Sequence, residues 1–398
     1  MLFRSGADVE YNPIALAHLL IGPQQATLFV GAGKVPADLA QALAADGVVL
    51  ADYGQAANSV AALPADAVVL LDPKRVTLGL RQAVPAGNRV VESINPSTLA
   101  KGCKTAEEVA HVREAMAEDG AAMCAFYAWF EAAMARGERV TELTVDEVLS
   151  AERAKRANFR GLSFSTIAGF NANGAMPHYR ALPESHAVIT GDGLLLIDSG
   201  GQYLGGTTDI TRVWPVGRIT ADHRRDFTRV LQGMINLSRA RFPKGTPGPM
   251  LDSLARAPLW ADSLEYFHGT GHGVGYFLNV HEGPQTISKA VVAPHMAMQA
   301  GMITSNEPGV YRPGRWGVRI ENLLLTVEAP GSEFGDFLAF ETLTLCPIDT
   351  RCIEPGLMRA DEVAWLNDYH AVVRERLAPR VSGDALAWLL ARTEPMAA

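Results

Sequence analysis

Residues 194–212 read LLLIDSGGQYLGGTTDITR and carry one aspartate beside each of two strand-like runs. An apolar run leads into Asp198, a glycine-rich turn follows, and Asp209 opens the second run. A β-hairpin here would bring both carboxylates onto neighbouring strands. Because two like charges at short range repel each other unless a cation lies between them, the stretch indicates a cation site. The alternative is a pair of ordinary turn aspartates, which are common beside glycine.

The stretch HGTGHGVG, residues 268–275, holds two histidines among glycines that disfavour a helix. We expect an extended segment in which His268, Thr270 and His272 share one face, while the glycines let a neighbouring backbone come close on the other. His281, in NVHEGP, follows nearby and can join them. A single histidine is often only structural, but three of the chain's 10 histidines in so short a stretch favour a functional site.

Two further segments supply charged residues in apolar surroundings. Glu307, in SNEPGVY, precedes a Pro-Gly turn, which predicts a strand end that projects the carboxylate into a cleft. In VRIEN, residues 318–322, alternation puts the two apolar side chains in the core and Arg319 and Glu321 together on the opposite face. The leucines that follow make an exposed strand improbable, so the charged face needs further partners. The alternatives are a turn glutamate and a surface ion pair.

The candidate metal ligands are Asp198, Asp209, His272, Glu307 and Glu321. A buried carboxylate is unfavourable without a compensating partner, and each of these residues lies in an apolar or glycine-rich stretch. Four carboxylates would balance two divalent ions. Oxygen donors with a single nitrogen suit Mn²⁺, although Co²⁺ and Zn²⁺ would also bind. The alternative, that these are unrelated surface groups, requires a coincidence across four segments.

Bulk properties narrow the class of protein. The chain has 398 residues, 48% of them apolar, which suits two globular domains better than one. A net charge of -8 without a Lys/Arg cluster argues against nucleic-acid partners. No apolar run approaches the ~18 residues of a membrane span, and the first residues lack a secretory-signal pattern, so we expect a cytoplasmic protein without membrane partners. The four cysteines form no CxxC pair, which disfavours a zinc knuckle or a disulfide framework.

The pattern along the chain predicts an α/β domain over residues 1–97 and a second domain over residues 98–398. Strand-like segments at 26–30, 48–53, 67–72 and 89–94 and a helix at 36–45 occupy the first. Capping boxes, Thr105 with Glu108 and Thr144 with Glu147, predict helices that run to about residue 136 and toward residue 156. Apolar spacing predicts an amphipathic helix at 222–242 whose apolar stripe faces the core. Strand-like and glycine-rich segments fill most of the remainder.

The motifs LLLIDSG, TTDITR, HGTGHGVG, NVHEGP, SNEPGVY and VRIEN occur in the order found in the pita-bread metallopeptidases, the superfamily of methionine aminopeptidase, prolidase, aminopeptidase P and creatinase. The chain resembles this superfamily over nearly its whole length, and most closely the cytosolic eukaryotic kind of aminopeptidase P. The resemblance implies an α+β fold, in which a small α/β creatinase-N-terminal-like domain precedes a pita-bread catalytic domain with a C-terminal extension. Residues 2–13 resemble a segment at or just before the second of two such N-terminal domains, which implies that the first is missing.

The resemblance also implies a role for each candidate ligand. Asp198 would chelate one metal ion, His272 and Glu307 would hold the second, and Asp209 and Glu321 would bridge the two. A hydroxide would lie between the ions, and Glu307 would accept its proton and pass it to the leaving nitrogen.

Four further residues would complete the site by the same resemblance. His178 and His281 would hydrogen-bond the substrate carbonyl and the tetrahedral intermediate, and His268 would line the subsite for proline. Arg319 would orient a bridging carboxylate and offset excess negative charge.

The implied activity is release of the N-terminal residue from small peptides that have proline in second position. One alternative is a prolidase restricted to Xaa-Pro dipeptides. Another is a catalytically inactive module that binds peptides, which the complete ligand set disfavours. Relatives also imply a homodimer.

Overall fold

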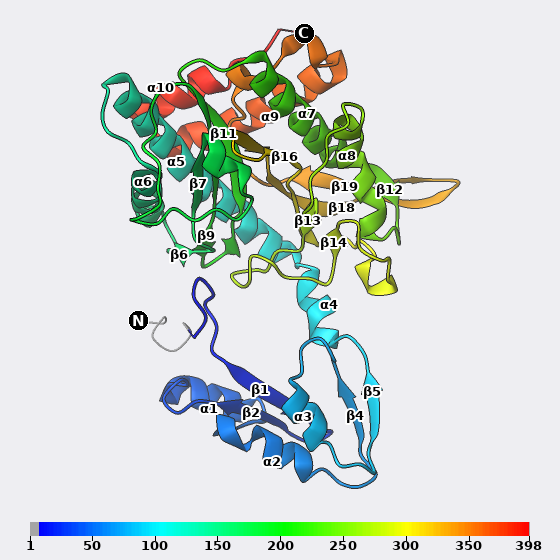
Figure 1. The fold of residues 1–398 in the computed structure, drawn as a ribbon. Coiled ribbons are helices and arrows are strands. Elements are labelled where there is room, and N and C mark those ends of the chain that lie inside the picture. Colours follow the sequence, from blue (N-terminus) through cyan, green and yellow to red (C-terminus); the bar gives the residue numbers. More distant parts are fainter. Residues whose placement is uncertain (1–7, 398) are drawn as a thin grey trace. The chain divides into compact units, whose positions relative to one another are not determined.

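The computed structural model describes residues 8–397, and the chain divides into two units, Met1–Ala100 and Lys101–Ala398 (Figure 1). Helix α4 (Pro96–Gly102) contains this division, which lies close to the boundary expected after residue 97. The first part of the segment 2–13, whose resemblance pointed to a missing domain, falls outside the described residues.

The smaller unit consists of short strands and helices. Strand β2 (Ala26–Val30) pairs antiparallel with β1 (Ala17–Ile21) and parallel with β3 (Val48–Asp52), while β4 (Val68–Leu71) pairs parallel with β5 (Arg89–Glu92). Its helices are α1 (Ala37–Ala45), α2 (Ala56–Ala61) and α3 (Leu78–Ala83). The predicted strands and the predicted helix are confirmed to within two residues. Strand β1 was missed because its sequence, AHLLI, has no regular polar alternation.

Two helices begin the larger unit. The predicted capping box at the start of α5 (Ala106–Ala135) is confirmed, since Thr105 Oγ1 accepts from the Glu108 N–H and the Glu108 carboxylate accepts from the Thr105 N–H. The predicted start of α6 (Glu142–Ala154) was wrong. Thr141 is the N-cap, with extended backbone and a side chain that accepts from the Thr144 N–H at 3.1 Å. Thr144 therefore lies inside the first turn, where it cannot cap the helix.

Helix α7 (Ala221–Ser238) confirms the predicted amphipathic helix. Its apolar stripe, Phe227, Val230, Leu231, Met234 and Leu237, is buried. The predicted end at residue 242 was wrong, because Arg241–Pro243 forms strand β12 and pairs with β19 (Gly335–Thr342).

The hairpin predicted over residues 194–212 is confirmed. Strands β8 (Gly193–Ser199) and β11 (Ile210–Val216) pair antiparallel, with Asp198 opposite Thr211, and β7 (Ile167–Phe170) pairs with the other edge of β8. The connection forms its own small hairpin, β9 (Gly201–Tyr203) with β10 (Gly206–Thr207), which β6 (Phe159–Leu162) extends. Asp209 lies directly before β11, so both aspartates lie at one end of this sheet.

A second sheet carries the later motifs. Strand β18 (Asn322–Ser332) pairs with β15 (Ile303–Asn306) on one side and with β19 on the other. Strands β16 (Gly309–Arg312) and β17 (Trp316–Arg319) form a separate hairpin, and β13 (Gly271–His272) pairs with β14 (Thr286–Ile287). The predicted alternation at residues 318–321 is confirmed, since Val318 and Ile320 belong to the main hydrophobic core while Arg319 and Glu321 face away from it into a cavity.

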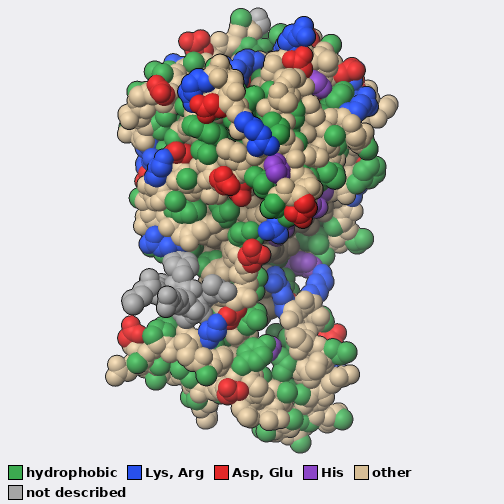
Figure 2. All heavy atoms as spheres, turned by 60° about the vertical axis from the view of Figure 1, so that its left-hand side comes forward, with side chains coloured by type: hydrophobic (Ala, Val, Ile, Leu, Met, Phe, Trp, Pro, Cys, Tyr) green, Lys and Arg blue, Asp and Glu red, His purple; other side chains and the backbone are tan. Residues whose placement is uncertain are grey.

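The remaining helices are α8 (Asp252–Trp260), α9 (Ala360–Leu377) and α10 (Gly383–Arg392). In Figure 1, α7, α9 and α10 lie together along one side of the strands of the larger unit. Among the described residues, none of the helices combines the length and the apolar composition that crossing a bilayer requires. Acidic and basic side chains are interspersed over the face of the larger unit that Figure 2 shows.

Candidate metal centre

A cavity of about 650 Å³ in the larger unit is lined by all the candidate ligands and catalytic residues that the sequence analysis proposed. These residues come from separate segments: the segment after β7, β8, the residue before β11, the residues around β13, the turn after β15, the end of β17 and the residue before β18. The set that lines the cavity includes Asp198, Asp209, His272, Glu307, Glu321, His178, His268, His281 and Arg319. The fold thus gathers in one place residues that are far apart in the sequence.

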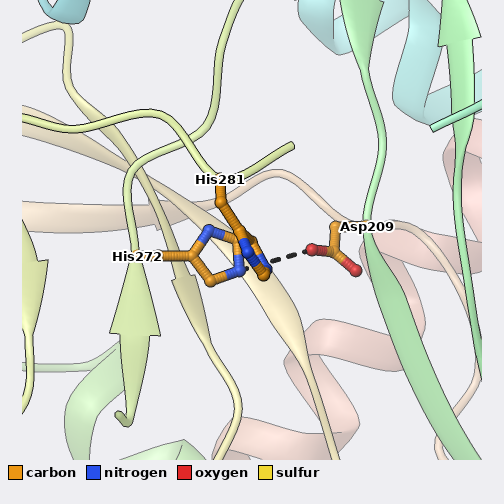
Figure 3. A group of neighbouring side chains, drawn as sticks. All are labelled: Asp209, His272 and His281. Carbon is orange, nitrogen blue, oxygen red and sulfur yellow. Dashed lines mark ion pairs between the residues drawn. The ribbon is translucent and has the colours of Figure 1, made fainter. Parts of the chain in front are cut away.

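The possible ligand atoms form three overlapping groups, within each of which the atoms lie within 4.8 Å of one another. One group is Asp198, Asp209 and Glu321, and a second is His272, Glu307 and Glu321. A third joins Asp209 to His272 and His281. In Figure 3 the two imidazole rings lie side by side, and an ion pair joins His272 Nε2 to Asp209 Oδ2 at 3.5 Å. Asp209, His272 and Glu321 each belong to two of the groups, and of these the two carboxylates have a pair of oxygens that could contact two cations at once.

The carboxylates of this cluster lack enough partners for their charge. Burial, followed by repulsion from Asp198 and Glu307, raises the pKa of Asp209 well above its ordinary value. Burial, followed by repulsion from Asp209 and Glu307, does the same to the pKa of Glu321. Asp198 Oδ1 and Glu321 Oε1 are buried and accept no hydrogen bond from any of residues 8–397. Buried oxygens without donors, in a group of carboxylates that repel each other, fit divalent cations as the missing partners.

Apart from histidines, Arg319 is the only basic residue of the described chain whose side chain pairs with the cluster. Its Nη2 donates to Asp198 Oδ2 at 2.5 Å, and its Nη1 donates to the Tyr311 hydroxyl at 2.7 Å. Its Nε lies 3.2 Å from Thr211 Oγ1, which itself donates to Glu321 Oε2 at 2.8 Å. One guanidinium therefore orients carboxylates on two sides of the site, and it cannot neutralise four of them.

Each of the four histidines at the cavity has a different setting. His272 Nδ1 lies 3.0 Å from the Gly273 carbonyl, which leaves Nε2 facing Asp209 and, at 3.3 Å, Glu307 Oε1. His268 Nε2 lies 2.8 Å from the Tyr311 hydroxyl, and burial lowers the pKa of His268 to about 4. The His281 ring packs edge to face against the His272 ring, with 4.0 Å between the centroids. His178 is exposed at the cavity wall.

Glycine allows the histidine segment to lie against its neighbour, as predicted. A Cβ atom on Gly271 would be 1.9 Å from the Ser305 carbonyl oxygen, so only glycine fits there. The expectation that Thr270 shares a face with the histidines was wrong. Its hydroxyl donates to Asp252 Oδ1 at 2.6 Å, at the start of α8, and it does not line the cavity. The hydrogen bond to a buried carboxylate overrides simple strand alternation at this position.

Two residues of the network, Thr211 and Tyr311, were missed by the sequence reasoning. Both lie inside quoted motifs, TTDITR and SNEPGVY. Thr211 is two positions after Asp209, and strand alternation could have placed it on the same face as the carboxylate. Tyr311 and Arg319 belong to the β16–β17 hairpin, so alternation along its two strands could have placed them together, whereas no local signal connects Tyr311 to His268.

Comparison with known proteins agrees with this arrangement. Residues 110–328 match metallopeptidase family M24, and residues 336–396 match the C-terminal region of that peptidase family. Residues 4–108 match the creatinase/prolidase N-terminal domain. The predicted fold, a pita-bread domain preceded by a creatinase-like α/β domain, is therefore confirmed.

Similar proteins are named as aminopeptidases. The chain is 39% identical over 412 residues to a probable Xaa-Pro aminopeptidase P of Coprinopsis cinerea, covering 98% of this chain and 66% of the fungal protein. It is 39% identical over 425 residues to aminopeptidase P2 of Arabidopsis thaliana, covering 98% of this chain and 60% of the plant protein. The chain thus spans about two thirds, or less, of the length of these curated relatives.

A solved structure has the same fold over nearly the whole chain. It is the X-prolyl aminopeptidase of Caenorhabditis elegans, described as a cytosolic enzyme with a di-nuclear active site, with a TM-score of 0.91 and 32% identity over 98% of this chain and 65% of the worm protein. Together with a family match that extends over more than half of the sequence, these likenesses establish that the chain belongs to metallopeptidase family M24.

Proposed function

We propose that this chain is an Xaa-Pro aminopeptidase that uses two divalent metal ions to release the N-terminal residue from peptides with proline in second position. The observation that carries the proposal is the cluster of Asp198, Asp209, His272, Glu307 and Glu321 around one cavity, with buried carboxylate oxygens that lack donors. The names of the fungal, plant and worm relatives support the substrate class.

The overlapping groups of ligand atoms support two metal positions. Asp198 on one side and His272 with Glu307 on the other would hold the ions, and Asp209 and Glu321, whose carboxylates each have two oxygens, could serve both. Four carboxylates and one imidazole favour Mn²⁺, with Co²⁺ or Zn²⁺ as substitutes. When bound, two such cations would supply polarisation of the scissile carbonyl and a lower pKa of water.

The chain's own residues would move protons and hold the substrate. Glu307 lines the cavity with its Oε1 3.3 Å from His272 Nε2, a position in which its carboxylate would accept a proton and pass it to the leaving nitrogen. His178 and His281 line the cavity beside this cluster and would donate hydrogen bonds to the substrate carbonyl. Arg319, through Asp198 and Thr211, would keep the ligands oriented.

An Xaa-Pro bond calls for a dedicated site because proline has no backbone N–H. A peptidase that holds its substrate through that donor cannot use such a bond. His268, oriented by Tyr311 at the cavity wall, would support the compact proline ring in place of the missing hydrogen bond.

The proposal is tested by hydrolysis of matched peptides with Mn²⁺-loaded protein. We expect release of the first residue from Xaa-Pro-Yaa tripeptides and none from Xaa-Ala-Yaa peptides. Cleavage restricted to Xaa-Pro dipeptides would indicate a prolidase instead. Glu307→Gln should lower kcat by roughly 10²–10⁴, while Glu328→Gln, an exposed carboxylate on β18, should leave kcat unchanged. Two bound ions without hydrolysis of any peptide would point to a binding module.

The remaining expectations concern the cell and the assembly. We propose a cytoplasmic location, which the description of the worm enzyme as cytosolic supports. A homodimer stays a prediction from the family resemblance, and light scattering of the purified protein would test it.

A further inference from the structure

His178 reaches the cavity on a segment with little regular structure of its own. Between the end of β7 at Phe170 and Ala187, the segment contains only a short 3₁₀ helix, Asn171–Ala175. His178 is exposed, and its side chain makes no hydrogen bond to any other residue that the structure describes. Its position therefore depends on what holds the backbone around it.

One buried carboxylate gathers this segment. Glu142, the first residue of α6, has no exposed surface. Its Oε1 accepts from the Phe170 N–H at 2.7 Å and its Oε2 from the Ala187 N–H at 2.7 Å, so the two ends of the segment meet at one side chain. Between them, the Asn173 amide lies 3.0 Å from both oxygens and the Tyr179 hydroxyl lies 2.8 Å from Oε2.

The hub formed by Glu142 and these hydrogen-bond partners requires a carboxylate at its centre. Two backbone N–H groups and the Asn173 amide donate to it, and the Tyr179 hydroxyl shares its single proton between Glu142 Oε2 and the Ser185 carbonyl oxygen, 2.7 Å away. An ionised carboxylate is the side chain that only accepts. Within the described residues, Glu142 forms no ion pair with Lys, Arg or His, so its negative charge is stabilised by these donors and by the N-terminal end of α6. Glutamine at this position would turn an NH₂ group toward a backbone N–H and break part of the hub.

Tyr179 connects the hub to the cavity. It directly follows His178, its hydroxyl contacts Glu142, and it lines the cavity together with His178. On the other side of the histidine, the Pro177 carbonyl faces Arg319 Nη2 at 3.5 Å. The backbone of His178 is thus fixed from both sides, by the hub and by the network that orients the metal ligands.

We propose that Glu142 is a positioning residue of the peptidase site, which holds His178 against the substrate by closing the segment 170–187 around its carboxylate. The expected effect of Glu142 on turnover rests on the proposed function. The expected effect of Glu142 on the order of segment 170–187 does not.

Hydrogen exchange tests the positioning without any activity. We expect Glu142→Gln to speed amide exchange across residues 171–187 while exchange in β8 and β11 and the number of bound Mn²⁺ ions stay unchanged. The matched control is Glu362→Gln, which removes a carboxylate of equal burial on α9 that bonds Gln232 and Arg359. The proposal would be overturned if Glu362→Gln also speeds amide exchange in residues 171–187. It would also be overturned if Glu142→Gln exchanges in that segment at the wild-type rate.

A double-mutant cycle tests the link to His178. We expect Glu142→Gln to lower kcat by up to about 10²-fold in the wild-type background, and by less than about threefold in a His178→Ala background, because a residue that acts through His178 has no further effect once it is gone. Equal losses in both backgrounds would mean a general structural role and would overturn the proposal.

Two provisions keep the result decisive. If Glu142→Gln does not fold, Tyr179→Phe removes one donor and leaves the carboxylate, and its effect on kcat should also vanish in the His178→Ala background. If the wild-type protein hydrolyses no Xaa-Pro peptide, the proposed function fails, and the exchange experiment alone decides whether Glu142 positions the segment.

Discussion

At the scale of single residues, the metal centre is built from groups that oppose folding when no cation is bound. The pKa values of Asp209, Glu307 and Glu321 are all raised, chiefly by burial and also by repulsion from neighbouring carboxylates, among them Asp198. A raised carboxylate pKa means that the ionised form is less favourable in the folded chain than in the unfolded chain. The site therefore resembles other functional sites, where local stability is lower than the fold alone would allow.

Glu321→Gln should accordingly stabilise the metal-free protein. The substitution keeps the shape, removes one of the mutually repelling charges and leaves the Thr211 hydroxyl with an oxygen to bond. We expect the free energy of unfolding in EDTA to rise by about 1 kcal/mol, and Mn²⁺ to stabilise the variant much less than the wild type. Urea denaturation with and without Mn²⁺ measures both.

The control for this experiment is Glu328→Gln on β18, the strand that begins directly after Glu321, because the Glu328 carboxylate is exposed and paired with Lys244. Its stability should change by less than about 0.5 kcal/mol. A Glu321→Gln variant that is less stable than the wild type in EDTA would show that the cluster does not repel itself as inferred.

At the scale of elements, the sequence correctly predicted those helices and strands that are determined by residues close together in the chain. The β8–β11 hairpin, the α5 capping box and the α7 stripe each depend on residues close together in the chain, and all three are present. The start of α6 was misplaced because Thr141 and Thr144 are both acceptable caps by sequence. What decides between them is the buried Glu142, whose partners lie some distance along the chain.

The candidate site also combines features that local sequence patterns reveal with features that they do not reveal. Alternation and glycine content were enough to select the five candidate ligands, His268, His281 and Arg319, which all line the cavity, whereas His178 was selected only through the family resemblance. The contact of Tyr311 with His268, and the hub at Glu142, join segments whose packing no local pattern specifies. Long-range hydrogen bonds of this kind become visible only in the folded chain.

Helix α9 supplies a prediction about pH. Nε2 of the buried His370 accepts from the Ile348 N–H at 3.1 Å, which requires a neutral ring, and burial, then the charges of Arg212 and Arg374, lowers the pKa of His370 to about 4. An unfolded histidine titrates near 6.5. Between pH 6.5 and pH 4 the unfolded chain binds a proton at His370 that the folded chain does not bind. The contribution of neutral His370 to the free energy of unfolding is therefore complete above about pH 6.5 and is lost as the pH falls toward 4.

The variant His370→Gln tests this, because an amide oxygen can accept the same hydrogen bond and does not titrate. We expect the variant to be less stable than the wild type at pH 7, and the difference to narrow by roughly 2 kcal/mol between pH 7 and pH 4. Urea midpoints at several pH values give the difference. Parallel curves for the two proteins would mean that His370 is not kept neutral by the fold.

At the scale of the whole molecule, the candidate metal centre adds to the hydrogen bonds that already join separate strands of the larger unit, such as those of Arg319 with Asp198 and of Thr211 with Glu321. Its candidate ligands, at residues 198–321, all lie outside the unit Met1–Ala100. A ligand that binds only the folded state stabilises it by about 2.7 kcal/mol per site at a hundredfold excess over Kd. We therefore expect Mn²⁺ to slow amide exchange in β8, β11 and β15 and to leave β2 and β3 unchanged. Hydrogen exchange with Mn²⁺ and with EDTA measures both units in one sample. Equal protection of both units would indicate that the ions act on the chain in general, and protection of neither would remove the metal centre as a source of stability.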